Sequence, residues 1–327
     1  MNSKPDVAIE PAVQQGRWPE MKRGRPMSLG LMLPTAEQNA VANESPRDGF
    51  WDTIAMAKLA LDVGFDMLWL PDHFILKLDR HGGEARGVWD CWTTAAGIAA
   101  ALPDTPLGTM VAATSFHNPG SIARMAESID EISRGNFVLG LGCGWHEPEY
   151  EMYGFPFDHR VDRFAEAMQI ISPLVRTGHA DFKGTYYQAS DAVNLPRGPR
   201  WREGGPPIIM GANKPRMMQL TARYADAWNS DWLARPEDIQ PMVSELDKAC
   251  AEIGRDPETL IRTSSTRFSF DDDADDPMLV HGAPEEMAAT LHAYANLGMR
   301  QHLVSLDPRT VDNFERFAKV IDVFDRG

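Results

Sequence analysis

Eight short apolar runs alternate along this chain with segments of helical periodicity, and this alternation limits the folds open to it. The runs are at residues 28–33, 65–70, 107–111, 137–141, 207–210, 227–229, 260–270 and 302–306. A run that is apolar throughout is typical of a strand buried on both faces, as in a parallel sheet whose crossovers are helices. Eight such units predict an α/β fold, the (β/α)8 TIM barrel. A doubly wound open sheet is the alternative, although no Gly-x-Gly-x-x-Gly follows the first run.

The segments between the runs predict the helices and loops of one barrel domain over residues 27–327. Helices are expected at 50–63, 92–101, 121–132, 161–175, 215–224, 236–253, 282–297 and 311–324. Residues 75–90, 147–160 and 178–205 depart from this periodicity, so we expect insertion loops there that shape a pocket at the carboxyl ends of the strands, with a hairpin in the last. Residues 1–26 contain prolines and mixed charge without periodicity and are expected as an N-terminal extension.

Composition excludes several classes of protein. The 43% share of hydrophobic residues supports a large core, and a net charge of −15 disfavours nucleic acid or anionic membrane as a partner. No apolar run has the length of a membrane span, and no N-terminal apolar segment precedes a cleavage-like site. The three cysteines, Cys91, Cys143 and Cys250, are odd in number and far apart, as in a reducing compartment. We therefore expect a cytoplasmic protein in which local backbone amides hold any anionic ligand.

Glycines, aromatic residues and acidic residues gather where the predicted strands end. The run 137–141 is followed by Gly142-Cys143-Gly144 and then by Trp145, His146, Glu147 and Glu149. Glycines at a strand end let another molecule approach the backbone closely. The other predicted strand ends supply 72–73, 115–118, 211–213 and Asn229. Because the carboxyl ends of barrel strands open onto one face, we predict a ligand-binding mouth there. A tight turn that needs glycine only for packing is the alternative reading of 142–144.

Asp72 and His73 form a candidate acid/base pair, in which the carboxylate orients the ring and His73 exchanges a proton near neutral pH. A helix-capping aspartate beside a structural histidine is the other interpretation. Gly211-Ala212-Asn213 precedes a predicted helix, so its amides and the helix dipole could hold a phosphate. The same residues could equally form an ordinary loop.

Other reactive residues at the predicted mouth favour structural roles. His117, His146 and Glu147 lack the spacing of metal ligands, so we expect no metal. Cys143 is expected to be a small packed residue rather than a nucleophile. Most tryptophans are core residues, but Trp145 and Trp228 follow predicted strand ends and are the two expected to stack on a planar ring.

An ordered set of motifs over about residues 28–325 resembles the luciferase-like monooxygenases. They are GFDMLWLPDHF at 64–74, LGTMV at 107–111 with FHNP at 116–119, GLGCGW at 140–145 with Glu149 and Gly154, PPIIMG at 206–211 and YADAWN at 224–229. Each motif is weak alone, whereas their order is specific. The resemblance implies a (β/α)8 barrel that binds reduced FMN or the deazaflavin F420 at the strand carboxyl ends, and a protein that tends to form homodimers.

The resemblance also implies roles for individual residues. His73 matches a catalytic position of the F420-using branch, and a non-prolyl cis peptide of the family falls at Met110–Val111. The turn 142–144 would lie beside the ring and 211–213 beside the phosphate. The implied cofactor-binding residues are Asp72, Met110, Val111, Ala113, Gly142, Cys143, Gly144, Trp145, Glu149, Gly211, Ala212 and Asn213. Trp145 departs from part of the F420 branch, which has an assisting glutamate there, so sugar-phosphate dehydrogenation is in doubt and the broad F420-dependent subgroup is the better match.

We therefore expect an oxidoreductase that transfers a hydride between F420 and a small organic substrate, with His73 exchanging the proton. The alternative is an FMN-dependent monooxygenase that receives reduced flavin from a separate reductase. F420 lacks the nitrogen that lets reduced FMN form an oxygen adduct, so the two cofactors imply different reactions. A non-catalytic flavin-binding protein is a third reading, for which a change of His73 to alanine would be silent.

Overall fold

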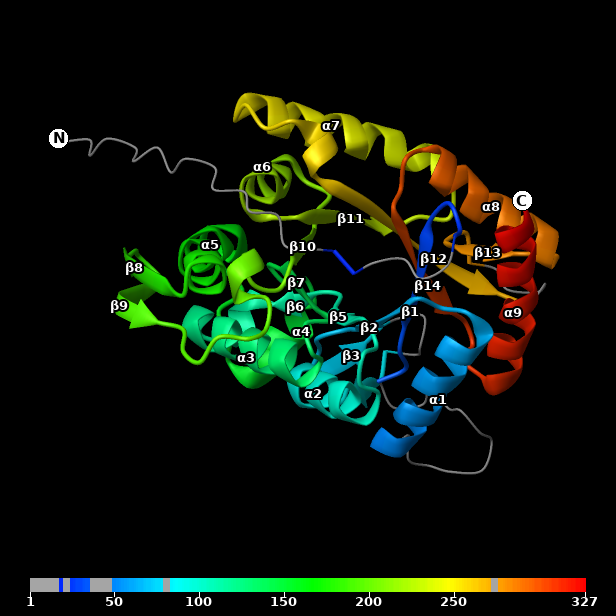
Figure 1. Ribbon diagram of the computed structural model, residues 1–327, viewed down its shortest axis with the longest axis horizontal. Coiled ribbons are helices and arrows are strands. Elements are labelled where there is room, and N and C mark those ends of the chain that lie inside the picture. Colours follow the sequence, from blue (N-terminus) through cyan, green and yellow to red (C-terminus); the bar gives the residue numbers. More distant parts are fainter. Residues whose placement is uncertain (1–17, 20–23, 36–48, 79–82, 272–275) are drawn as a thin grey trace.

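The computed structural model describes residues 18–19, 24–35, 49–78, 83–271 and 276–327 (Figure 1). Within them, eight parallel strands form a closed barrel, as the alternation of apolar runs predicts. The barrel strands, in chain order, are β1 (Ser28–Met32), β2 (Met67–Leu70), β5 (Leu107–Thr109), β7 (Phe137–Gly142), β10 (Ile208–Gly211), β11 (Ala227–Trp232), β12 (Ile261–Ser269) and β14 (Gln301–Leu306). Parallel pairing of β10 with β7 closes the barrel, so no open sheet edge remains on this ring.

Helices follow the barrel strands and surround them. They are α1 (Phe50–Val63), α2 (Cys91–Ala101), α3 (Pro119–Ile132), α5 (Arg160–Arg176), α6 (Pro215–Tyr224), α7 (Gln240–Glu252), α8 (Pro284–Asn296) and α9 (Val311–Arg326). Single-turn 3₁₀ helices at Thr114–Phe116, Trp201–Glu203, Pro236–Ile239 and Pro257–Thr259 join some of these elements. Each expected helix is present, and α1 ends as predicted at Gly64, which is left-handed (φ 119°).

Shorter elements interrupt the alternation. The segment after β2 contains an antiparallel pair, β3 (Ile75–Lys77) with β4 (Ala85–Gly87), and the segment after β7 contains α4 (Glu147–Tyr153). The loop expected at residues 147–160 is therefore wrong over its first half, which is helical. Two further short strands, β6 (Ala112–Ala113) and β13 (Leu279–His281), pair in parallel with β7 and β12.

The predicted hairpin in residues 178–205 is confirmed as β8 (His179–Lys183) paired antiparallel with β9 (Gln188–Val193). Its strands lie at the left edge of Figure 1, beyond α5 from the barrel. The turn between the two strands is held to α5, where Glu166 accepts the backbone N–H groups of Thr185 and Tyr186. The expectation that this hairpin shapes the pocket is wrong, because the hairpin follows a helix rather than a barrel strand.

The hydrophobic core has two layers. Most buried apolar side chains lie between the strands and the helices, and a smaller cluster fills the inside of the barrel. Trp69 dominates the inner cluster: it is fully buried, and its indole N–H donates to Gln301 Oε1 at 3.1 Å. A Cβ on Gly108 would lie 2.5 Å from the Trp69 ring, so glycine is required where that ring crosses the neighbouring strand.

The segment before β1 is described only in part, because residues 1–17 and 20–23 of the expected extension lie outside the described residues. Trp18 packs against the inner cluster, its ring centroid 6.3 Å from that of Trp69. Arg25 pairs with Asp66 and Asp325, which anchors the entry to β1 beside α9. Among the helices that are described, none has the length and apolar character needed to cross a bilayer.

Candidate active site

Three of the strand ends that were predicted to converge are those of β2, β5 and β7, which are neighbours in the barrel. Asp72 and His73 follow β2, Ala113 lies on β6 just after β5, and Glu149 lies on α4 after β7. Hydrogen bonds join all three segments to one another, as described below. The carboxyl ends of these strands therefore form one site, as the fold predicts.

His73 is held by Glu149. The Nδ1 atom of His73 is 2.7 Å from Glu149 Oε1, and the two side chains are 15% and 1% exposed. The other carboxylate oxygen, Oε2, accepts the backbone N–H of Phe74 at 2.6 Å. The predicted pairing of His73 with Asp72 is wrong, because adjacent residues of an extended segment point their side chains in opposite directions.

Asp72 instead joins two loops of the mouth. Its Oδ2 atom accepts the backbone N–H of Ala113 at 2.9 Å, so the end of β2 is bound to β6. Burial raises the pKa of Asp72 to about 7, although the Ala113 hydrogen bond and the nearby His73 oppose that rise. Asp72 is therefore a buried acid beneath the mouth, only 7% exposed.

The chain leaves β5 through a non-prolyl cis peptide at Met110–Val111, which confirms that expectation. Just before it, Thr109 Oγ1 donates to the carbonyl of Gly140 (2.7 Å) and accepts its N–H (2.9 Å). A side chain thus replaces backbone pairing at the point where β5 separates from β7. Met110 and Val111 are both half-buried and contribute apolar surface at the mouth.

The glycine-rich turn after β7 packs against its own neighbours. A Cβ on Gly142 would lie 2.6 Å from Val111 Cγ2, and a Cβ on Gly144 would collide with the Tyr150 hydroxyl. That hydroxyl donates to the Cys143 carbonyl at 3.3 Å. Burial raises the pKa of the Cys143 thiol, which agrees with a packed residue rather than a nucleophile. Packing therefore accounts for Gly142 and Gly144, and Cys143 and Gly144 keep part of their surface exposed.

Two tryptophans expected to stack on a ring differ in their positions. Trp145 is 60% exposed, and its ring is edge-on to His73 at 5.7 Å between centroids. Trp228 is fully buried between the barrel and the helices, where its indole N–H donates to the Ala212 carbonyl at 2.8 Å. The expectation for Trp228 is wrong, because side chains alternate along β11 and this one points away from the barrel axis.

The segment 211–213 leads into α6. Gly211 is half-buried, and Ala212 is buried with its N–H bonded to Asn229 O. No side chain caps the first turn of α6, and the neighbouring side chains include those of Lys214 and Arg216. A helix start without a side-chain cap beside the exposed Lys214 suits a phosphate group. The first helical residue, Pro215, has no N–H, and Arg216 is paired with Asp162. Asn229 itself is committed to barrel residues, donating to Thr263 Oγ1 and accepting from Ser265 Oγ.

The two other histidines predicted at the mouth, His117 and His146, have hydrogen-bond partners that explain them. His146 Nε2 accepts the backbone N–H of Lys77 at 3.0 Å, and His117 Nε2 accepts the indole N–H of Trp92 at 3.1 Å. Burial lowers the pKa of both rings. The anchoring role of His146 is not visible in the sequence, because its partner is a main-chain group 69 residues away.

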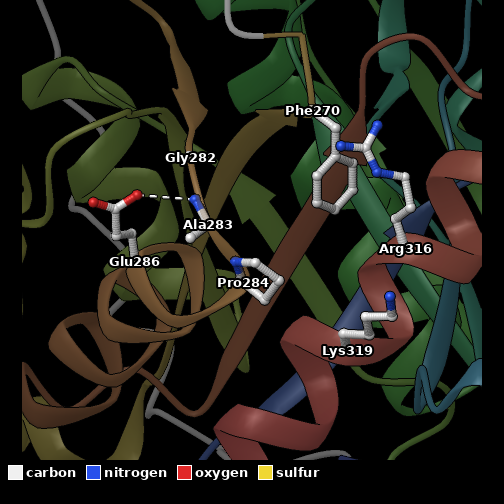
Figure 2. A pocket seen from close by; sticks show the side chains of 7 residues that line it. All are labelled: Phe270, Gly282, Ala283, Pro284, Glu286, Arg316 and Lys319. Carbon is white, nitrogen blue, oxygen red and sulfur yellow. Dashed lines mark hydrogen bonds between the residues drawn. The ribbon is translucent and has the colours of Figure 1, made fainter.

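A cavity of about 550 Å³ lies elsewhere, between the start of α8 and α9 (Figure 2). It is lined by Phe270, Gly282, Ala283, Pro284, Glu286, Arg316 and Lys319. The Glu286 carboxylate accepts the Ala283 N–H, which caps α8, and Arg316 stacks over the Phe270 ring at 4.3 Å. None of the residues that converge around His73 lines this cavity, so it is separate from the candidate site.

Comparison with known sequences identifies the family. The sequence model of the family described as luciferase-like monooxygenase matches residues 27–278, well over half of the chain. The chain belongs to the luciferase-like monooxygenase family. The fold and the ordered motifs around His73 and the turn 142–144 agree with this assignment.

Similar proteins include one named as a monooxygenase and one named as a ketoreductase. The chain is 31% identical over 287 residues to pyrimidine monooxygenase RutA of Methylobacterium radiotolerans, covering 83% of this chain and 71% of the relative. It is 31% identical over 231 residues to the phthiodiolone/phenolphthiodiolone dimycocerosates ketoreductase of Mycobacterium kansasii, covering 65% of this chain and 62% of the relative. The protein is accordingly an enzyme, and its class is oxidoreductase.

A solved structure shares the fold. An F420-dependent secondary alcohol dehydrogenase in complex with an F420-acetone adduct superposes with a TM-score of 0.76, at 17% identity, over 91% of this chain and 99% of that one. The similarity confirms the TIM barrel.

Proposed function

We propose that this enzyme transfers a hydride between the deazaflavin F420 and a small organic substrate, with His73 exchanging the accompanying proton. The observation that carries the proposal is the state of the His73 ring. Its Nδ1 is bound to the buried Glu149, whereas Nε2 has no hydrogen-bond partner among the described residues, and the side chain stays 15% exposed. An oriented imidazole with one open nitrogen suits proton exchange with a bound substrate.

The residues around His73 fit a flat redox ring. Met110, Val111, Cys143 and Gly144 are half-buried and present apolar side chains and bare backbone. Trp145 is exposed beside His73 and could cover one edge of such a ring. In this proposal those four residues line the ring, while Asp72, Ala113 and Gly142 hold the loops that present them.

The start of α6 fits the phosphate of the cofactor. Its first turn has no side-chain cap, and the exposed Lys214 adds positive charge to a chain of net charge −15, whereas the charge of Arg216 is paired with Asp162. Gly211 and Asn213 would approach the phosphate, whereas Ala212 has its N–H and C=O bound to β11 and would support the turn. When bound, a deazaflavin supplies a two-electron hydride acceptor or donor, and the protein supplies position and proton exchange.

FMN-dependent monooxygenation is the second candidate. The relative with 31% identity over 83% of this chain is named a pyrimidine monooxygenase, which favours oxygen chemistry. That reaction would use the same site and would need a separate reductase to supply reduced flavin. The F420-dependent alcohol dehydrogenase, whose fold matches at a TM-score of 0.76, supports the first candidate.

Titration of the purified protein with F420 and with FMN, each oxidised and reduced, distinguishes the candidates by cofactor fluorescence. We expect micromolar binding of F420, with weaker binding of FMN. Tight binding of reduced FMN with substrate-dependent oxygen consumption would favour the monooxygenase instead. Micromolar binding of neither cofactor would contradict both.

The variant His73→Gln tests the role of the ring. We expect it to bind the cofactor as the wild type does and to lose about 10²- to 10⁴-fold in turnover, the usual contribution of a general acid or base. Unchanged turnover would remove His73 from the mechanism and favour a different proton carrier or a non-catalytic flavin-binding protein.

A further inference from the structure

The Glu149 carboxylate is fully engaged by the segment that carries His73. Oε1 faces His73 Nδ1 at 2.7 Å, and Oε2 accepts the N–H groups of Phe74 (2.6 Å) and Ile75 (3.4 Å). The side chain is 1% exposed. Both oxygens of this buried carboxylate are therefore directed at the segment that carries His73, and the side chain is closed off from solvent.

These contacts determine where the His73 proton lies. Phe74 and Ile75 offer backbone N–H groups, which can only donate, so Glu149 acts towards them as an acceptor. A carboxylate in that state also accepts from the imidazole, which places the single proton of the neutral ring on Nδ1. Nε2 then carries a lone pair and has no protein partner among the described residues.

A second contact holds the same two segments together. His146, three residues before Glu149, accepts the N–H of Lys77 through Nε2 at 3.0 Å. Both ends of strand β3 are thus bound to the start of α4, Ile75 through Glu149 and Lys77 through His146. His146 uses Nε2 for this bond, and its ring is 6.1 Å from that of His73, so it acts as an anchor. The carboxylate within hydrogen-bond distance of the His73 ring is that of Glu149.

We propose that Glu149 is a positioning residue that fixes His73 in its Nδ1–H tautomer, so that Nε2 accepts a proton from the substrate. This inference rests on the proposed function. In the oxidative direction a C–H bond of the substrate breaks and its hydride, with two electrons, passes to the oxidised deazaflavin. The O–H or N–H proton on the same carbon's substituent passes to His73 Nε2, and a C=O or C=N bond forms. The substrate class is therefore an alcohol or an amine, or its carbonyl or imine in reverse.

The tautomer can be measured directly by nitrogen NMR of the full-length protein labelled with ¹⁵N-histidine, without cofactor or substrate. The His73 signals are assigned by their loss in His73→Gln. We expect an unprotonated Nε2 and a protonated Nδ1 in the neutral ring of the wild type. A protonated Nε2 in the wild type would overturn the proposal, and this reading does not depend on any variant folding.

The variant Glu149→Gln changes the acceptor pattern at nearly constant shape. Its amide oxygen can still accept from Phe74, whereas its NH₂ group then faces Nδ1 and can only donate. We expect the His73 proton to move to Nε2 and turnover to fall about 10²-fold, with the affinity for F420 unchanged. Glu147→Gln, a change at an exposed position of the same helix, is the matched control and should alter neither the His73 tautomer nor the turnover.

Two results would contradict the positioning role: an unchanged tautomer in Glu149→Gln, or a shifted tautomer with unchanged turnover. Failure of the proposed function is distinguishable from failure of the positioning role. In that case the wild type would bind neither F420 nor FMN, whereas NMR would still report the tautomer of His73.

Discussion

The side chain of Val111 occupies the space that a side chain on Gly142 would need. A Cβ on Gly142 would lie 2.6 Å from Val111 Cγ2, whereas a Cβ on Gly211 would lie 3.6 Å from Val111 Cγ1. Val111 thus packs closely against β7 and loosely against β10, the two strands that close the barrel. Bare backbone at 142 therefore serves the packing of the mouth.

We predict that Gly142→Ala is destabilising. A β-branched valine has few rotamers with which to move away, so the clash should lower the free energy of unfolding by about 1–3 kcal/mol and weaken cofactor binding. Gly211→Ala is the matched control, because its new methyl group would make an ordinary contact with the same valine; its stability should stay within about 1 kcal/mol of the wild type. Denaturant unfolding measures the stability of the two variants. Equal effects of the two changes would show that Val111 does not limit the site.

The barrel could be predicted because its strands are buried on both faces and leave a pattern in the sequence. The run 137–141 and strand β7 (Phe137–Gly142) differ by one residue. Helix α4 was not predictable from periodicity, because seven residues make only two turns. Its signal was Pro148 near the first turn, flanked by Glu147 and Glu149, which is typical of a helix start.

The sequence identified which residues belong to the site better than it identified which of them contact one another. Strand ends identified His73 and Glu149, but their pairing joins residues 76 apart and depends on how α4 docks on β3. Asp72 was the nearer carboxylate in sequence and the wrong partner. Trp228 was wrong for a related reason, since a position at a strand end does not tell which face of the barrel the side chain takes.

We predict that His302 makes the protein less stable in acid. The ring is fully buried, its Nδ1 is 2.7 Å from Ser264 Oγ, and burial lowers its pKa from the ordinary 6.5 to about 3. Between pH 6.5 and 3 the unfolded chain binds a proton there that the folded chain does not. The free energy of unfolding therefore falls as the pH falls across this window, with a slope that approaches ~1.4 kcal/mol per pH unit.

The variant His302→Gln isolates that slope, because glutamine can still bond to Ser264 and does not titrate. Its stability should fall less steeply than that of the wild type between pH 7 and 5, as measured by urea unfolding. His281→Gln, at an exposed position on β13, should keep the wild-type slope. Parallel curves for His302→Gln and the wild type would contradict a neutral, buried His302.

For Asp72 we predict the opposite pH dependence of the free energy of unfolding. Burial raises its pKa from the ordinary 3.8 to about 7, so the folded chain holds a proton between these values that the unfolded chain has lost. The stabilisation is present below about pH 4 and is lost as the pH rises through 7. Asp72→Asn keeps an acceptor for the Ala113 N–H and does not titrate.

Relative to the wild type, Asp72→Asn should therefore gain stability as the pH rises from 4 to 8, by on the order of 2–4 kcal/mol. Unfolding curves at several pH values measure the difference. Asp62→Asn, at an exposed position on α1, should show a difference from the wild type that does not change with pH. A flat difference for Asp72→Asn would mean that this carboxyl ionises normally in the folded protein.

Trp145 provides a test of where the cofactor ring lies. Its side chain is 60% exposed, so Trp145→Ala should change the free energy of unfolding by no more than about 0.5 kcal/mol. If the indole covers an edge of the bound ring beside His73, its loss should weaken F420 affinity about 3- to 10-fold, which corresponds to ~1 kcal/mol of aromatic contact.

The control is Trp201→Ala, which removes a tryptophan of similar exposure, 48%, from the loop before β10 rather than from the end of a barrel strand. Its affinity for F420 should equal that of the wild type, and Trp145→Phe should recover most of the loss. Because stability is held constant in all three proteins, a fluorescence titration reports on the contact itself. Equal affinities in the two alanine variants would show that Trp145 does not contact the cofactor ring. The indole would then lie on the side of His73 that faces the substrate.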